Sequence, residues 1–123
     1  MVKIAIIEDD ATISQMYRMK FEADGFDVRL ASNDTIGVAL VESFRPDVIL
    51  LDIQMPEMDG AEALRRIRSH AWGKTIPVIV LTNLGEEEAP REMRSLGIQG
   101  YIVKANLTPR QVVAQVKSVI TKP

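Results

Sequence analysis

The chain has 123 residues, 46% of them hydrophobic, which is enough for one core and predicts a single domain over residues 1–123. Its 15 Lys and Arg against 17 Asp and Glu leave a net charge of -2, so there is no basic field for nucleic acid, and the lack of cysteine excludes disulfides and zinc thiolate sites. No apolar run is long enough for a membrane span or a signal peptide, and we expect a soluble cytoplasmic protein.

Five short runs rich in β-branched residues and leucine predict strands, and a helical pattern follows each of them. In chain order the runs are Lys3 to Ile7, Phe26 to Ala31, Val48 to Leu51, Pro77 to Leu81 and Gly100 to Val103. The second run alternates enough to suggest an exposed edge. The first, third and fourth are apolar throughout, as in strands buried on both faces.

The helices between these runs are marked by apolar faces and by end signals. The first has Ile13, Met16, Tyr17 and Phe21 inward and stops at Asp24-Gly25. The second starts after Asn33 or Asp34, with Ile36, Leu40 and Phe44 inward. The third carries Ala61, Leu64 and Ile67, and the fourth runs roughly from Glu86 to Leu96 with a thin apolar stripe. The last starts at Thr108-Pro109 and buries Val112, Val113, Val116 and Ile120.

This alternation of strands and helices predicts an α/β fold. A parallel sheet would be covered on both faces by helices through right-handed crossovers. In such sheets the ligand site lies outside the carboxyl ends of the strands, where the strand order reverses. Functional residues are therefore expected just after the predicted strands.

Polar residues follow four of the predicted strands. Glu8-Asp9-Asp10 follow the first, Asp52 the third, Thr82 the fourth and Lys104 the fifth. Each alone has an ordinary explanation, since strands must end and acids favour helix N-termini. Together they bring at least three carboxylates to one edge, and carboxylates this close repel each other unless cations are present. Lys104 supplies one charge, and Mg2+ suits a site of few carboxylates plus water and phosphoryl oxygens.

Such a cluster suits phosphoryl chemistry. A carboxylate can attack phosphorus to give an acyl phosphate when the phosphoryl oxygens are neutralised and aligned. Lys104 can pair with one of these oxygens, and the Thr82 hydroxyl can donate a hydrogen bond to another. A flavodoxin-type cofactor site is disfavoured, because the three acids after the first strand would repel phosphate without a metal.

Four motifs in order, each at a strand end, resemble the receiver domain of two-component response regulators. They are Ile6-Ile7-Glu8-Asp9-Asp10, Leu50-Leu51-Asp52-Ile53-Gln54-Met55-Pro56-Glu57-Met58-Asp59-Gly60, Val80-Leu81-Thr82 and Tyr101-Ile102-Val103-Lys104. The resemblance covers essentially the whole chain. It implies the flavodoxin-like (βα)5 fold, a doubly wound parallel sheet of three layers with strand order 2-1-3-4-5.

By this resemblance the protein is a phosphoacceptor in a phosphorelay and not an enzyme acting on a separate substrate. Asp52 would take a phosphoryl group from a histidine kinase or a histidine phosphotransfer protein. Asp9 would bind Mg2+ directly, Glu8 would assist through water, Asp52 would be a ligand as well, and the backbone carbonyl of Gln54 would complete the protein's share.

The resemblance also implies a switch. The added phosphoryl group brings about 1.5 to 2 negative charges near neutral pH. Drawing Thr82 toward it would let Tyr101 turn inward and would repack the face made by the fourth helix, the fifth strand and the last helix. We expect the signal to reach a downstream effector protein, with the chain a monomer or a phosphorylation-dependent dimer.

Some positions depart from the family pattern. Ala105 stands where most receivers have a proline, and Asn83 is larger than the small residue common after the threonine. Leu84 cannot orient an attacking water, which predicts a long-lived phosphoryl group. Gln54 is not the second acid that an aspartate-nucleophile phosphatase would need. The alternative left open is a receiver-like interaction module that signals without phosphorylation.

Overall fold

A parallel sheet of five strands lies at the centre of the molecule. In the computed structural model, which describes residues 1–55, 58–85 and 91–120 and only the backbone of residues 54, 55, 58 and 59, the strand order is β2-β1-β3-β6-β7. The strands are β1 (Lys3–Ile7), β2 (Asp27–Ala31), β3 (Val48–Leu51), β6 (Val78–Thr82) and β7 (Gly100–Val103). This is the predicted order 2-1-3-4-5, so the flavodoxin-like fold is confirmed.

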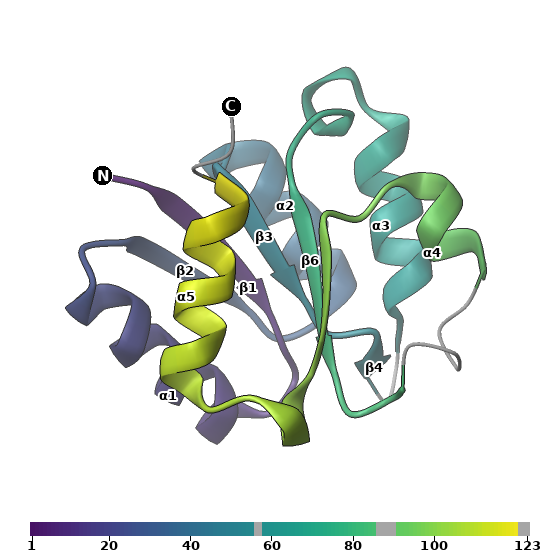
Figure 1. Cartoon of the computed structure of the whole chain (residues 1–123). Coiled ribbons are helices and arrows are strands. Elements are labelled where there is room, and N and C mark those ends of the chain that lie inside the picture. The colour runs from purple at the N-terminus through teal and green to yellow at the C-terminus, as the bar shows by residue number, and fades with distance from the viewer. Residues whose placement is uncertain (56–57, 86–90, 121–123) are drawn as a thin grey trace.

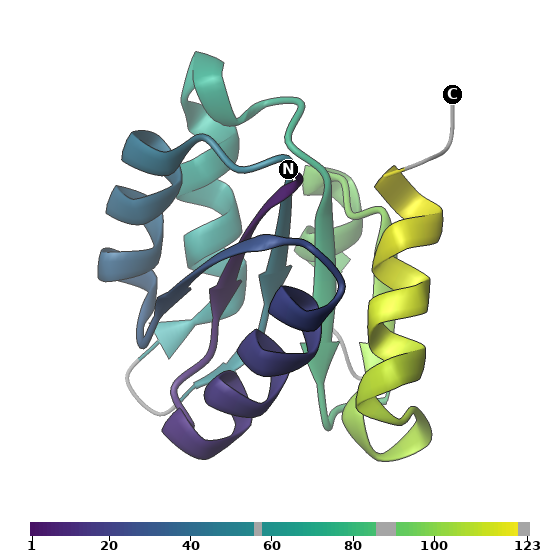
Figure 2. The ribbon, with the colours of Figure 1, turned by 90° about the vertical axis from the view of Figure 1, so that its left-hand side faces the viewer.

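Helices cover both faces of the sheet. They are α1 (Ala11–Ala23), α2 (Asp34–Phe44), α3 (Gly60–Ser69), α4 (Arg91–Leu96) and α5 (Pro109–Ile120). One face carries α1 and α5, and the other carries α2, α3 and α4 (Figure 1, Figure 2). Neighbouring strand residues therefore enter different layers, with Leu51 packed toward α2 and α3 and Leu50 toward α1 and α5. Within the described residues, no helix combines the length and the apolar character needed to cross a membrane.

Side-chain caps explain where two of the predicted helices begin. Asn33 caps α2, because its Oδ1 accepts a hydrogen bond from the Ile36 N–H at 2.8 Å. At α5 the Thr108 Oγ1 accepts from the Gln111 N–H at 3.2 Å, and Gln111 Oε1 accepts from the Thr108 N–H at 2.8 Å. This reciprocal capping box, followed by Pro109, fixes the start of α5 at the predicted residue.

The inward face of α1 differs in part from the prediction. Tyr17 and Phe21 are buried as expected, but Met16 is 36% exposed. The third buried residue of the helix is Ser14, so the inward stripe runs through positions 14, 17 and 21. This spacing of three and four residues is one helical face, and it leaves Met16 at the edge toward solvent.

The predicted face of α2 is wrong at its centre. Ile36 is 48% exposed and Leu40 is half-buried, whereas Gly37 and Val41 are buried. The reason lies at Gly37, where a Cβ atom would be 2.7 Å from Ile7 Cδ1. The helix lies so close to β1 at this contact that a larger residue would have to displace the Ile7 side chain, and this orientation turns Ile36 outward.

The fourth helix is described over its second half only. Residues 86–90 of the predicted helix lie outside the described part of the chain. Over Arg91–Leu96, Met93 is the buried residue, which agrees with the thin apolar stripe expected from the sequence. Gly97 follows the helix with φ +88°, a left-handed conformation that favours glycine and ends the helix.

Candidate functional site

Two acids leave neighbouring strands at the same level of the sheet. β1 and β3 pair in parallel with Ile7 opposite Leu51. Both acids continue the sheet by one residue, since the Glu8 N–H donates to Ala31 O of β2 at 2.9 Å and the Asp52 N–H donates to Ile7 O of β1 at 3.0 Å. The strand order reverses between these two strands, so Glu8 and Asp52 lie where a doubly wound sheet places its ligand site.

The structure brings three of the predicted acids together. One carboxylate oxygen each from Glu8, Asp9 and Asp52 lies within 4.8 Å of the others. Glu8 and Asp52 are almost fully buried, and Asp9 is exposed on the solvent side of the cluster. A set of carboxylate oxygens with one open side fits Mg2+, which prefers oxygen ligands and keeps several waters.

Lys104 joins both buried acids. It follows β7, and its Nζ donates to Glu8 Oε2 at 2.9 Å and to Asp52 Oδ2 at 3.3 Å. No peptide bond among the described residues is cis, so the bond between Lys104 and Ala105 is trans. The absence of the usual proline at Ala105 therefore does not remove Lys104 from the acids.

The close contacts change the proton affinities of the cluster. Burial, together with the hydrogen bond to Asp52, raises the pKa of Glu8 from 4.5 to about 7. Burial also opposes the charge of Lys104, but the hydrogen bond to Glu8 and the charge of Asp52 raise the pKa of Lys104 above its ordinary value. The site therefore exchanges a proton near neutral pH, and any cation that binds here competes with that proton.

Thr82 and Tyr101 both form hydrogen bonds with the backbone of Leu84, in the loop that follows β6. Thr82 is fully buried, and its Oγ1 accepts a hydrogen bond from the Leu84 N–H at 3.4 Å. The Tyr101 hydroxyl donates to Leu84 O at 3.0 Å, with Gly85 O at 3.3 Å as a second acceptor. Tyr101 is half-buried in this structure, and its inward turn on phosphorylation stays a prediction.

The turn after β3 holds the backbone of Asp52 in place. A Cβ atom on Gly60 would lie 2.4 Å from Ile53 Cα and 2.9 Å from Asp52 O, so α3 begins in direct contact with this backbone. Gln54 pairs with Asp59 between two short antiparallel strands, β4 (Gln54–Met55) and β5 (Met58–Asp59). The role of the Gln54 carbonyl toward Mg2+ stays a prediction.

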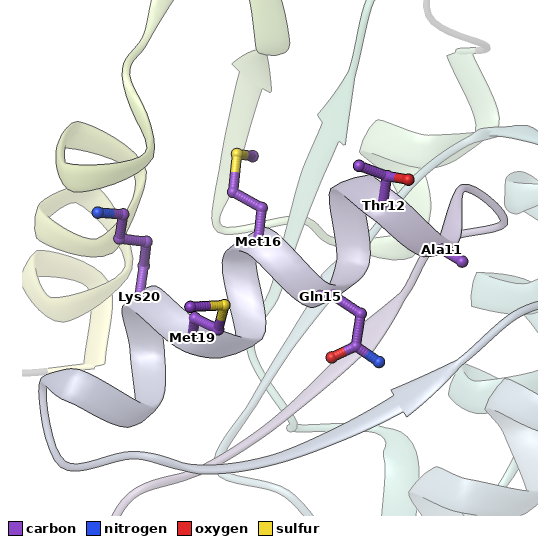
Figure 3. A pocket seen from close by; sticks show the side chains of 6 residues that line it. All are labelled: Ala11, Thr12, Gln15, Met16, Met19 and Lys20. Atoms are coloured by element: carbon purple, nitrogen blue, oxygen red, sulfur yellow. The ribbon is translucent and has the colours of Figure 1, made fainter.

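An apolar hollow on α1 lies next to the acidic cluster along the chain. The helix starts at Ala11, directly after the acids. Its outer face, with Met16, Met19 and Lys20, lines a hollow of 540 Å³ (Figure 3). Met19 is 68% exposed. This surface was not predicted, and its sequence signal is two methionines three residues apart, which share one side of a helix.

Comparison with known proteins gives one family. The profile described as "Response regulator receiver domain" matches residues 4–117. The phosphate regulon transcriptional regulatory protein PhoB of Rhizobium meliloti is 34% identical over 121 residues, which are 98% of this chain and 52% of PhoB. The transcriptional regulatory protein SrrA of Staphylococcus aureus is 35% identical over 120 residues, 98% of this chain and 48% of SrrA. The chain thus spans about half the length of these two relatives.

Solved structures agree with this match over nearly the whole chain. The chemotaxis response regulator CheY4 of Vibrio cholerae superposes with a TM-score of 0.88 at 28% identity, covering 97% of this chain and 98% of CheY4. A CheY-like receiver domain protein of Methanospirillum hungatei gives a TM-score of 0.87 at 26% identity, covering 98% of this chain and 94% of its own. Sequence and fold therefore lead to the same family.

Proposed function

We propose that this chain, which belongs to the response regulator receiver domain family, accepts a phosphoryl group on Asp52 with the help of Mg2+. The observation that carries the proposal is the geometry around Asp52. A buried carboxylate shares the ammonium of Lys104 and lies within 4.8 Å of two further acids, one of them exposed. Burying several carboxylates close together costs free energy, so an acid without a function is not expected to lie in such a cluster.

In the proposed reaction an Asp52 carboxylate oxygen attacks the phosphorus of a phosphohistidine. The new P–O bond forms while the P–N bond breaks, and the donor imidazole leaves with the bonding electron pair. Mg2+, when bound by Glu8, Asp9 and Asp52, supplies positive charge for the phosphoryl oxygens. Lys104 pairs with one phosphoryl oxygen in exchange for part of its contact with Asp52, and Thr82 donates a hydrogen bond to another. The group is lost by hydrolysis: a water oxygen attacks the phosphorus, the P–O bond to Asp52 breaks with its electron pair left on the carboxylate, and inorganic phosphate leaves after the water proton passes to solvent.

The signal would leave through the loop after β6. The Thr82 hydroxyl now accepts from the Leu84 N–H, and turning it toward the phosphoryl group breaks that bond. The carbonyl of the same residue, Leu84, accepts from the Tyr101 hydroxyl, so a shift of Thr82 changes the packing of Tyr101 and of α4 beside it. We propose this α4, β7 and α5 face as the output toward a downstream effector.

The donor would dock on the α1 hollow. A histidine kinase or a histidine phosphotransfer protein must bring its histidine to Asp52, and the hollow with Met16 and Met19 begins at Ala11, the residue after Asp10, which caps α1. Flexible methionine side chains suit helix packing with a partner of limited complementarity. Met19→Glu should slow transfer from a phosphorylated histidine phosphotransfer protein and leave acetyl phosphate as a donor unaffected.

Intact mass after incubation with acetyl phosphate and Mg2+ tests the proposed function. Wild-type protein should gain the mass of one phosphoryl group, and Asp52→Asn should gain none. Asp9→Asn should lower the incorporation. Asp10→Asn is the matched control, because Asp10 caps α1 through a bond from the Ile13 N–H and asparagine caps equally well. Wild-type protein that takes no phosphoryl group would instead favour the interaction module without phosphorylation.

A further inference from the structure

Three neighbouring arginines on α3 make different kinds of contact. Arg66 pairs with Glu62 of the same helix, with 3.1 Å between Nη2 and Oε1. Arg65 crosses to α4, where its Nε lies 2.5 Å from Glu92 Oε1. Arg68 reaches the opposite end of α4. These contacts, together with the packing of the two helices, make α3 the support against which α4 rests.

Arg68 binds backbone oxygens. Its Nε donates to Leu96 O and its Nη2 to Gly97 O, both at 3.0 Å, while Nη1 donates to Gly73 O at 2.6 Å. In the described part of the chain, no carboxylate lies within ion-pair distance of this guanidinium. The carbonyls at a helix C-terminus carry the negative end of the helix dipole, so a half-buried cation there is well placed to hold α4. Burial lowers the pKa of Arg68, but an arginine stays protonated at any ordinary pH.

The two contacts with α4 differ in how easily they break. The side chains of Arg65 and Glu92 are 50% and 42% exposed, so water screens their attraction and can replace it. Arg68 donates to the main-chain carbonyls of two successive residues. These hydrogen bonds do not depend on the rotamer of any α4 side chain. Gly97 adds a change of chain direction at this end, because its φ of +88° is left-handed. The C-terminal end of α4 is therefore fixed more firmly than its exposed face.

We propose that Arg68 is a positioning residue that holds the C-terminal end of α4 as a pivot, and that the Arg65–Glu92 pair is a latch that opens when α4 swings about it. This rests on the proposed function, in which phosphorylation acts on Thr82 and on the loop at Leu84. The chain runs from that loop to the N-terminal side of α4. With one end held, a displacement at the other end becomes a rotation of the helix rather than a loss of its packing.

The latch is tested with two variants of the full chain. Arg65→Ala and Arg66→Ala remove the same side chain from neighbouring positions, but only the first touches α4. Amide NMR shifts of Met93 and Tyr101 are compared with those of wild type before and after addition of Mg2+ with beryllium fluoride, a phosphoryl mimic. Arg65→Ala should move the shifts of the untreated protein toward the activated values, with an active population up to about fivefold higher, the limit for an exposed ion pair. Arg66→Ala should leave them in place.

A charge swap and a conservative variant complete the test. Arg65→Glu combined with Glu92→Arg should rebuild the pair and return the shifts to those of wild type. Arg68→Lys keeps the charge but cannot reach three carbonyls at once. It should speed amide exchange at Gly97 and reduce the shift that the mimic induces in α4, while phosphorylation of Asp52 by acetyl phosphate continues. A merely structural Arg68 predicts lower stability with an unchanged response, and this result would overturn the pivot.

The outcomes separate this proposal from the proposed function. Wild-type protein that takes no phosphoryl group and shows no shift with the mimic overturns the proposed function. Wild-type protein that responds, while Arg65→Ala and Arg66→Ala behave alike, overturns the latch alone. The pivot is tested with Arg68→Lys rather than Arg68→Ala, so the result does not depend on a variant that fails to fold.

Discussion

Two charged regions of the molecule pair a cation with carboxylates in opposite surroundings. At the edge of the sheet the side chains of Lys104, Glu8 and Asp52 are 13%, 3% and 4% exposed, whereas those of Arg65 and Glu92 on the helical layer are 50% and 42% exposed. Charges in a poorly hydrated site interact strongly, and an unbalanced one is costly, while water screens a surface pair. The fold thus concentrates electrostatic free energy where a phosphoryl group would be added and leaves the exposed ion pair of the helical layer, the proposed output, easy to rearrange.

The largest expected effect comes from removing Lys104, the largely buried cation that contacts both buried acids. Lys104→Met leaves Glu8 and Asp52 facing each other without their ammonium, and breaking a buried ion pair in this way costs about 3–5 kcal/mol. Lys117→Met is the matched control, because Lys117 pairs with Asp24 at 2.7 Å with both side chains well exposed. That pair should contribute about 0–1 kcal/mol. Urea unfolding of both variants without metal measures the difference.

An equal loss of unfolding free energy in Lys104→Met and Lys117→Met would contradict the difference between the buried and exposed ion pairs. Such a result would mean that water reaches Glu8 and Asp52 in solution as freely as it reaches Asp24. Addition of Mg2+ gives an independent check, since a cation bound by the acids replaces part of the missing charge. Lys104→Met should therefore recover part of its stability with Mg2+, and Lys117→Met should recover none.

A smaller effect is expected from pH. The pKa of Glu8 rises from 4.5 to about 7 in the folded protein, chiefly through burial. Between these values the folded state binds more protons than the unfolded state, so the free energy of unfolding falls as the pH rises through this window, by up to about 3 kcal/mol. The contribution is fully present below pH 4.5 and lost above about pH 7. Lys104 does not add to the change, because its pKa lies above the window.

Urea unfolding across this pH range, with a chelator present, measures the effect as the difference between wild type and Glu8→Gln. The variant cannot ionise, so the fall due to Glu8 should be absent from its profile. With Mg2+ the wild-type profile should flatten, because the metal binds the ionised carboxylate. Parallel profiles of the two proteins would show that Glu8 titrates like an ordinary surface acid.

The close approach of Gly60 to the backbone of Asp52 and Ile53 supports the buried cluster, and a substitution at Gly60 tests this support. A Cβ atom at Gly60 would press on Ile53 Cα at 2.4 Å, so Gly60→Ala should cost about 1–3 kcal/mol and slow phosphorylation of Asp52 by acetyl phosphate. Gly100→Ala is the control, since its new Cβ would meet Ile79 at 3.4 Å, close to an ordinary contact. Thermal unfolding and intact mass report the two effects. Equal behaviour of the two variants would remove Gly60 from the support of Asp52.

The site could be located from the sequence because its position follows from topology. Glu8, Asp52 and Lys104 each follow a predicted strand, and parallel strands end at one edge, so the contacts of Lys104 with both acids are a consequence of the fold. The alternation of strands with helices predicts a parallel sheet covered on both faces, and the resemblance to receiver domains predicts the strand order. The chemical roles of Thr82, Tyr101 and the Gln54 carbonyl stay predictions.

Other features could not be predicted because no side-chain pattern marks them. Gly37 faces inward against Ile7, and a glycine carries no hydrophobic signal from which a helix face can be assigned. Arg68 binds the carbonyls of Leu96 and Gly97, which are 28 and 29 residues away in the sequence. Every residue offers a backbone carbonyl, so the sequence does not show which of them an arginine will reach. The spacing of Met16 and Met19 places both on one side of α1, but it does not show that this side is exposed rather than part of the core.

The smallest expected effect lies in the helical layer, at Glu92. Its hydrogen bond with Arg65 lowers the pKa of this exposed carboxyl group below its ordinary value. The stabilising contribution is therefore present above the ordinary pKa and is lost as the pH falls through the lowered one. Titration of the Glu92 carboxyl carbon by NMR should show the lowered pKa in wild type and in Arg66→Ala, and a return toward the ordinary value in Arg65→Ala. A Glu92 pKa that is the same in all three proteins would mean that the pair does not persist in solution, and α4 would then be held to α3 by Arg68 and by packing without a latch.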